Sequence, residues 1–216
     1  MIDLHTHTFF SDGVLVPAEH LRRVEVLGYH AVAITDHADS SNLDFIVPRI
    51  VKVAADLNQH SVTRLIPGIE LTHVPPGMFK DLTEEARRLG ALIVVGHGET
   101  VVEPVVPGTN LAAIEAGVDI LAHPGFISEE ETRMAASRGI LLELSARKGH
   151  SLTNGHVAAM ALRFGAKLVV NADAHGPGDF LTASMAKIVA LGAGVTEAGF
   201  EQIRRNMAEL VERVTQ

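Results

Sequence analysis

The chain has 216 residues, of which 47% are hydrophobic and 20% are charged, and its formal net charge is −8. These values indicate a single globular domain, residues 1–216, and the acidic balance argues against extended nucleic-acid binding, which needs clustered Lys and Arg. No apolar run approaches the roughly 20 residues that cross a bilayer, and the lack of cysteine excludes disulfides and thiolate ligands.

Strands and helices are predicted to alternate along the chain. Short strands, most of them apolar on both faces, are expected at residues 1–7, 31–35, 65–71, 91–95, 118–122, 140–144 and 167–170. Helical periodicity and capping residues predict helices at residues 17–27, 43–57, 80–89, 111–116, 128–137 and 157–164, and an amphipathic terminal helix around residues 200–214. Pro67 and Gly68 predict a bulge or a sheet edge near the end of the third strand.

About seven βα units with doubly apolar strands predict a parallel sheet covered by helices and closed, or nearly closed, into a barrel. The chain is shorter than the ~250 residues of a typical eight-unit barrel. We therefore predict an α/β fold, a seven-stranded (β/α)7 TIM-like barrel. Because the first strand begins at residue 2, no signal peptide is expected, and the predicted location is the cytoplasm, away from membranes.

Histidine is unusually frequent, with 12 residues, and two of them form a His-x-His pair in the first predicted strand. Residues two apart in a strand share a face, so His5 and His7 point the same way and could hold one metal ion between their imidazoles. The pair alone is a weak signal, and it gains weight from the other strands.

Six of the seven predicted strands end in a side chain that can bind a metal. Since the carboxyl ends of parallel barrel strands open on one face, these side chains should converge there. Asp12, just past the first strand, should lie on the same rim. The complete set is His5, His7, Asp12, His37, Glu70, His97, His123, Asp173 and His175.

These motifs in this order resemble the PHP family, the polymerase and histidinol phosphatase superfamily of metal-dependent phosphoesterases. The matching segments are 5–7 with Asp12, 35–37, 68–70, 96–97, 123–124 and 171–175. The resemblance implies a distorted (β/α)7 barrel that holds a cluster of two to three divalent metal ions. A His-rich ligand set suits Zn, Mn or Fe.

Carried over position by position, the resemblance implies three metal sites. The first would be held by His5, His7, Glu70 and Asp173. Glu70 would bridge to the second, with His97 and His123, and the third would be held by Asp12, His37 and His175. The expected reaction is hydrolysis of a phosphate ester, a small-molecule monoester in particular, by a hydroxide that bridges two metals, with Glu70 and Asp173 in catalytic positions.

Three residues after the sixth strand are expected to face the same rim. We assign Arg147 and Lys148 to phosphate binding, with the bidentate guanidinium of Arg147 as the stronger candidate. His150 is a candidate catalytic residue that protonates the leaving group. Glu143, inside the barrel, is expected to orient a ligating histidine.

Two other classes of function stay open. Amidohydrolase-type C–N hydrolases also begin with His-x-His on a barrel strand, but they often use a bridging carboxylated Lys, and here Glu70 takes that position. A non-catalytic, metal-bound regulatory or nucleic-acid-associated module is the third reading, against which the complete ligand set and the acidic charge both weigh. The expected partner is therefore a small phosphorylated substrate.

Overall fold

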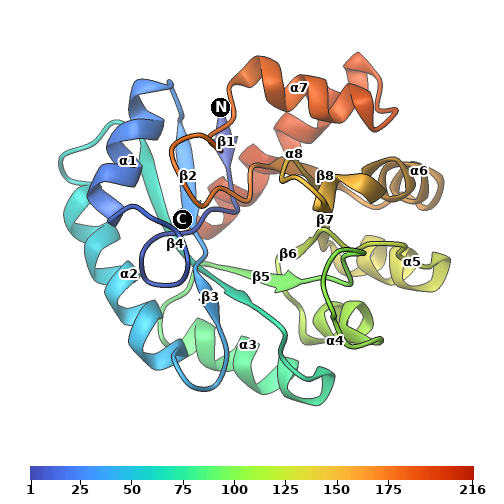
Figure 1. Ribbon diagram of the computed structural model, residues 1–216, viewed down its shortest axis with the longest axis horizontal. Coiled ribbons are helices and arrows are strands. Elements are labelled where there is room, and N and C mark those ends of the chain that lie inside the picture. Colours follow the sequence, from blue (N-terminus) through green and yellow to red (C-terminus); the bar gives the residue numbers. More distant parts are fainter.

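The computed structural model describes residues 1–216, and its strands form one parallel sheet that helices surround (Figure 1). The strands are β1 (Ile2–Asp3), β2 (Ala31–Ile34), β3 (His37–Ala38), β4 (Arg64–Leu71), β5 (Ile93–His97), β6 (Ile120–Ala122), β7 (Leu141–Ser145) and β8 (Leu168–Asn171). The helices are α1 (Pro17–Val26), α2 (Leu43–Leu57), α3 (Phe79–Arg88), α4 (Thr109–Ala116), α5 (Glu129–Arg138), α6 (Asn154–Phe164), α7 (Ala183–Gly192) and α8 (Glu197–Thr215), with short 3-10 turns η1 (Pro76–Met78) and η2 (His150–Thr153).

The strands are hydrogen-bonded in the order β1-β2-β4-β5-β6-β7-β8, and β3 extends the line of β2 along β4. Seven parallel positions thus alternate with helices in a nearly closed barrel, which confirms the predicted (β/α)7 fold. The core is continuous and built mainly from Val, Ile, Leu and Ala of the strands and of the inner helix faces. None of the helices combines the length and the apolar composition that crossing a membrane requires.

The barrel closes between β1 and β8 by side chains rather than by a continuous ladder. The only bridge between the two segments pairs Thr6 with Ala174. The backbone N–H of Leu4 donates to Oδ1 of Asn171 at 2.9 Å. The buried carboxylate of Asp3 accepts from the N–H of Ala172 at 3.2 Å. These contacts fix the first strand against the last one.

Two local predictions differ from the structure. A sheet edge at the third predicted strand is wrong, because β4 is paired on both sides, with β2 and β5. Gly68 is needed there for space, since a Cβ atom would lie 2.8 Å from Cγ2 of Thr35 and 3.0 Å from the carbonyl oxygen of Ile93. Helix α7 was not expected, although Thr182 caps it by accepting from the N–H of Met185.

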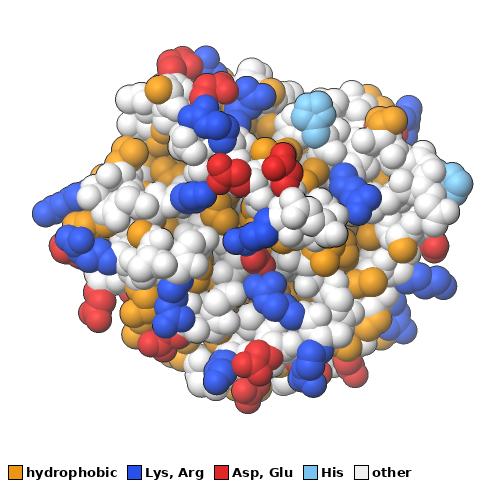
Figure 2. Space-filling view, turned by 180° about the vertical axis from the view of Figure 1, so that it is seen from behind, with side chains coloured by type: hydrophobic (Ala, Val, Ile, Leu, Met, Phe, Trp, Pro, Cys, Tyr) orange, Lys and Arg blue, Asp and Glu red, His pale blue; other side chains and the backbone are white.

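Seen from behind, Lys and Arg side chains lie among Asp and Glu side chains, and few histidines are visible (Figure 2). Most of the histidines are instead buried or partly buried in the interior. Apart from His20 in α1 and His156 in α6, these histidines lie around the carboxyl ends of the strands.

Candidate metal centre

The structure brings the ends of six strands together at one mouth of the barrel. His5 and His7 follow β1, and their ring centroids are 5.0 Å apart with both side chains buried. All nine residues predicted as metal ligands fall into overlapping groups, in which the donor atoms lie within 4.8 Å of one another. These groups are His5–His7–Glu70, His5–His123–Asp173, Glu70–His97–His123 and His7–Asp12–His37–His175.

The first predicted set is split over two of these groups. His5 belongs to both, with its Nε2 atom 3.4 Å from Oε1 of Glu70 and 3.9 Å from Oδ1 of Asp173. The Nε2 atom of His7 lies 3.2 Å from Oδ1 of Asp173. Glu70, at the end of β4, and Asp173, just past β8, therefore face the same two imidazoles from different sides of the barrel.

The second predicted set lies together as one group. The Nε2 atom of His123 is 3.7 Å from Oε1 of Glu70, and the rings of His97 and His123 have centroids 4.6 Å apart. All three side chains are buried. Glu70 thus faces both the first and the second set, as a bridging carboxylate must.

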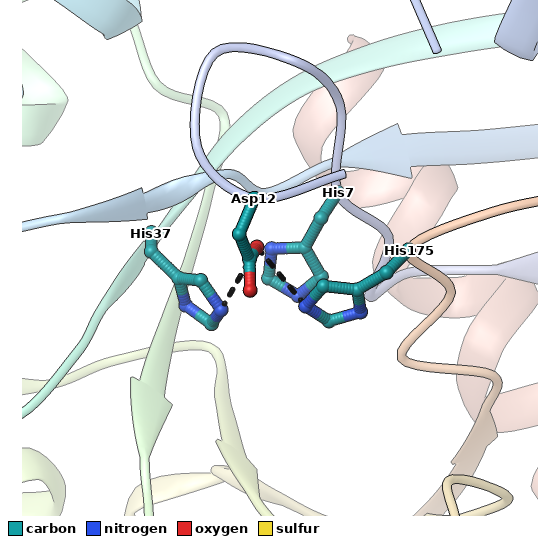
Figure 3. Close-up of side chains that lie close together, drawn as sticks. All are labelled: His7, Asp12, His37 and His175. Atoms are coloured by element: carbon teal, nitrogen blue, oxygen red, sulfur yellow. Dashed lines mark ion pairs between the residues drawn. The ribbon is translucent and has the colours of Figure 1, made fainter. Parts of the chain in front are cut away.

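The third predicted set lies at the rim, and the structure adds His7 to it (Figure 3). Oδ1 of Asp12 lies 3.1 Å from Nε2 of His175 and 3.4 Å from Nε2 of His37. The ring of His7 stacks on that of His175 with centroids 4.2 Å apart.

The loop that carries Asp12 is held by a buried carboxylate. Asp36 accepts hydrogen bonds from the N–H and the hydroxyl of Thr8 and from the hydroxyl of Ser11, each at 2.7 Å. The loop also returns to β8 through the N–H of Val14, which donates to the carbonyl oxygen of His175. Residues far apart in the sequence are thereby fixed around one point.

The residues present fit a bound metal cluster. Several buried nitrogen and oxygen atoms in the centre have no hydrogen-bond partner. Burying an unpaired polar atom costs free energy unless a bound ion or ligand interacts with it. These unpaired atoms are Nε2 of His5, both ring nitrogens of His7, Oε1 of Glu70, Nδ1 of His97, Nδ1 of His123 and Oδ1 of Asp173. Imidazole nitrogens and carboxylate oxygens are the ligand types that divalent transition metals take.

The protonation states of several donors suit this role. Burial and the neighbouring His37 lower the pKa of His7, and burial and His97 lower the pKa of His123, so both rings are neutral at pH 7. Burial opposes ionisation of Glu70, yet His5 and His37 hold its pKa well below the usual range. Neutral imidazoles and an ionised carboxylate are the forms that bind metals.

Two residues would release a proton on metal binding. Burial disfavours a charged His5, but Glu143 and Glu70 beside it raise the pKa of His5 well above its usual value. Burial raises the pKa of Asp173 to about 7. Cations bound in the centre would lower the pKa values of both His5 and Asp173, because a bound ion dominates the local electric field.

A cavity of about 330 Å³ opens on the centre and has no hydrophobic residue in its wall. Arg147 lines it, with Nη1 3.2 Å from the carbonyl oxygen of Asp173 and 2.6 Å from Nδ1 of His175. His150 also lines it, and its ring stacks on His123 with centroids 4.1 Å apart. Lys148 is exposed and lies outside this cavity, on the wall of a neighbouring one.

Two acidic residues support the centre from outside the ligand set. Glu143 contacts a histidine as expected, with Oε2 2.7 Å from Nδ1 of His5. Glu103, in the loop after β5, was not identified from the sequence. Its carboxylate lies 3.0 Å from Nε2 of His97 and 3.2 Å from Nε2 of His73. Hydrogen bonding to His97, opposed by burial, lowers the pKa of Glu103 to about 2.

Backbone strain is concentrated in the same region. Three non-glycine residues have positive φ, namely His123 at 28°, Asp173 at 52° and His73 at 52°. Such conformations persist where the surrounding structure enforces them, and they cluster at functional sites. Two of the three, His123 and Asp173, are themselves predicted metal ligands.

Comparison with known proteins agrees with this geometry. The sequence profile of the PHP domain matches residues 3–122. An uncharacterized protein of Methanocaldococcus jannaschii is 46% identical over 215 residues, which cover 98% of this chain and 99% of that protein.

Two solved structures share the fold at low sequence identity. A candidate histidinol phosphatase of Listeria monocytogenes is 13% identical, with a TM-score of 0.58 over 86% of this chain and 99% of its own. A Xaa-Pro dipeptidase with bound methionine is 12% identical, with a TM-score of 0.62 over 100% of this chain and 76% of its own. The PHP domain profile matches more than half of the chain, and the Methanocaldococcus jannaschii protein matches nearly all of it. The chain therefore belongs to the PHP domain family.

Proposed function

We propose that the protein is a metal-dependent hydrolase of phosphate esters, and that its substrate is a small-molecule phosphate monoester. The observation that carries the proposal is the clustering of nine His, Asp and Glu donors at one mouth of the barrel, where six of them line a polar cavity of about 330 Å³. Six of the nine donors are neutral imidazoles when they bind metals, and only three are carboxylates. Two to three bound divalent ions would therefore leave the site with a net positive charge, although the whole chain is acidic. That charge suits a phosphate dianion.

Bound divalent ions would supply charge neutralisation for the phosphate and would lower the pKa of water in the site. The protein itself would position the ester. Arg147 reaches the cavity from the loop after β7, and its guanidinium would hold two phosphate oxygens. Its contacts with Asp173 and His175 fix the guanidinium beside the donors.

His150 would hold a proton for the leaving group. Its Nε2 atom lies 3.4 Å from Oε1 of Glu103 and 3.9 Å from Oδ2 of Asp173, and Nδ1 lies 2.7 Å from the hydroxyl oxygen of Thr100. Burial lowers the pKa of His150, so a minor fraction of the ring is protonated at neutral pH, and that protonated form is a stronger acid. The Thr100 contact keeps the ring oriented toward the cavity.

The Listeria monocytogenes structure that shares the fold is named as a candidate histidinol phosphatase, and this supports a phosphate ester as substrate. The dipeptidase that shares the fold keeps hydrolysis of an amide bond as the second candidate. Glu70 supports the phosphoesterase, because its carboxylate lies near both His5 and His123, where a bridging carboxylated Lys is often expected in amidohydrolase-type enzymes.

The test compares both classes of substrate on one preparation. Chelator-treated protein would be reloaded with Mn²⁺, Zn²⁺ or Fe²⁺ and offered p-nitrophenyl phosphate, its bis-ester, and a panel of dipeptides and hydantoins. We expect metal-dependent release of nitrophenol from the monoester. Glu70→Gln should abolish it, whereas Glu130→Gln, on the exposed face of α5, should have no effect. Cleavage of dipeptides without cleavage of any phosphate ester would contradict the proposal.

A further inference from the structure

A second cavity, of about 590 Å³, lies beside the metal centre. It is bounded by the loop after β7, by the loop after β8 and by helix α7. Unlike the polar cavity, it has a wall that is half hydrophobic, and Leu181, Met185 and Val189 contribute to it. Helix α7 turns the side chains of Met185 and Val189 the same way, because they are four residues apart.

The two cavities meet at Arg147 and Asp173, which line both of them. Arg147 therefore lies at the boundary between the polar cavity and the second cavity. If Arg147 binds the phosphate of a substrate, the group bonded to that phosphate could extend across this boundary into the second cavity. The planar guanidinium can also stack on an aromatic ring while it binds an anion.

Four charged residues also line the second cavity, namely Arg147, Lys148, Asp173 and Asp179. The carboxylate of Asp179 is occupied, since its Oδ2 accepts from the N–H groups of His175 and Gly176 at 3.0 and 2.9 Å. Lys148 is exposed, and its ammonium group is free to reach solvent. A pocket of this size whose wall combines apolar side chains with charged ones is suited to an organic ligand that carries a charged group.

We propose that this second cavity binds the organic group of the substrate, and that this group is apolar and preferably aromatic. The inference rests on the proposed phosphoesterase function, whose substrate it specifies. The phosphate would lie in the polar cavity, Arg147 would lie at the junction, and the aromatic group would contact Leu181, Met185 and Val189.

The experiment measures kcat and KM for glycerol phosphate, phenyl phosphate and 1-naphthyl phosphate with metal-loaded protein. Added apolar area in a fitting pocket changes selectivity by roughly tenfold or more, so KM should fall about tenfold from phenyl to naphthyl phosphate. Met185→Trp and Val189→Trp would fill the cavity, and each should remove this preference. Ile188→Trp is the matched control, since Ile188 is exposed on the same helix and lies outside the cavity wall.

Thermal unfolding of each variant would verify that it is folded, and two filling variants guard against one that is not. Equal KM values for phenyl and naphthyl phosphate, or a preference that both filling variants retain, would overturn the inference while the phosphoesterase function stands. An absence of phosphate release from all three esters would instead refute the phosphoesterase function, and this inference with it.

Discussion

The Nδ1 atom of His5 lies 2.7 Å from Oε2 of Glu143, and both side chains are completely buried. The same carboxylate oxygen accepts a hydrogen bond from Nδ2 of Asn171 at 3.0 Å. Glu143 thereby fixes the ring of His5 so that Nε2 faces Glu70, at 3.4 Å from Oε1. A carboxylate behind a ligating imidazole sets its tautomer and raises its basicity.

Replacing Glu143 by Gln should therefore weaken metal binding while the fold is retained. Loss of such an outer partner typically costs about 10- to 100-fold in metal affinity. Competition with a chromophoric chelator would measure the change, and Glu130→Gln on the surface of α5 serves as the matched control. Unchanged affinity in Glu143→Gln would show that His5 is oriented without its carboxylate partner.

Arg147 and Lys148 are adjacent in sequence but should respond differently to substitution. Arg147→Ala removes a charged contact to phosphate worth ~1.5–3 kcal/mol, so kcat/KM should fall about 10- to 100-fold, mainly through KM. Lys148→Ala should change KM for a small ester little, because Lys148 lies outside the polar cavity. Steady-state kinetics on p-nitrophenyl phosphate would test both. An unchanged KM in Arg147→Ala would remove this residue from phosphate binding.

His20 should make stability depend on pH independently of the metal centre. It is buried in α1 against Phe180, with ring centroids 4.8 Å apart, and burial lowers its pKa from 6.5 to about 4. The unfolded chain therefore binds a proton between pH 6.5 and 4 that the folded protein does not. Stability is full above pH 6.5 and falls as the pH drops, by about 2 kcal/mol at pH 5.

Urea unfolding of chelator-treated protein at pH 7 and pH 5 would measure this loss. His20→Phe should lose about 2 kcal/mol less than the wild type between the two pH values, since Phe does not titrate. His60→Ala, at an exposed histidine, should behave like the wild type. Equal pH dependence in wild type and His20→Phe would contradict the assignment.

Asp36 should control the rim donors through the loop that it holds. An Asn at this position cannot accept all three hydrogen bonds from Thr8 and Ser11, and each unsatisfied buried donor costs ~1–3 kcal/mol. Asp36→Asn should lower stability by that order and reduce metal retention after dialysis, because Asp12 loses its fixed position. Asp44→Asn, exposed on α2, is the control. Full metal retention in Asp36→Asn would show that metal binding does not depend on how Asp36 holds this loop.

The barrel and the cluster of donors could be predicted because both depend on short-range patterns. Doubly apolar strands followed by helices specify a parallel sheet, and a potential metal ligand at the end of six of the seven predicted strands specifies the mouth. Glu70 and His123 are 53 positions apart in the sequence, yet their strands alone were enough to predict that they meet.

Loop residues were not predictable in the same way. Glu103 reaches His97 because its loop is folded back, with the carboxylate of Glu99 accepting from the N–H groups of Gly108 and Asn110. No periodicity in the sequence specifies that fold. Lys148 follows a strand closely, but beyond the last ladder pair the alternation of faces no longer determines where a side chain points.

The side-chain seam between β1 and β8 gives the centre a mechanical role. His5 and His7 lie on one side of this junction, and Asp173 and His175 lie on the other. Ions bound between them would therefore hold the first strand of the barrel against the last one. Stripping the cations should loosen the barrel first along this line, where amide protons such as those of Leu4 and Ala172 depend on side chains for their partners.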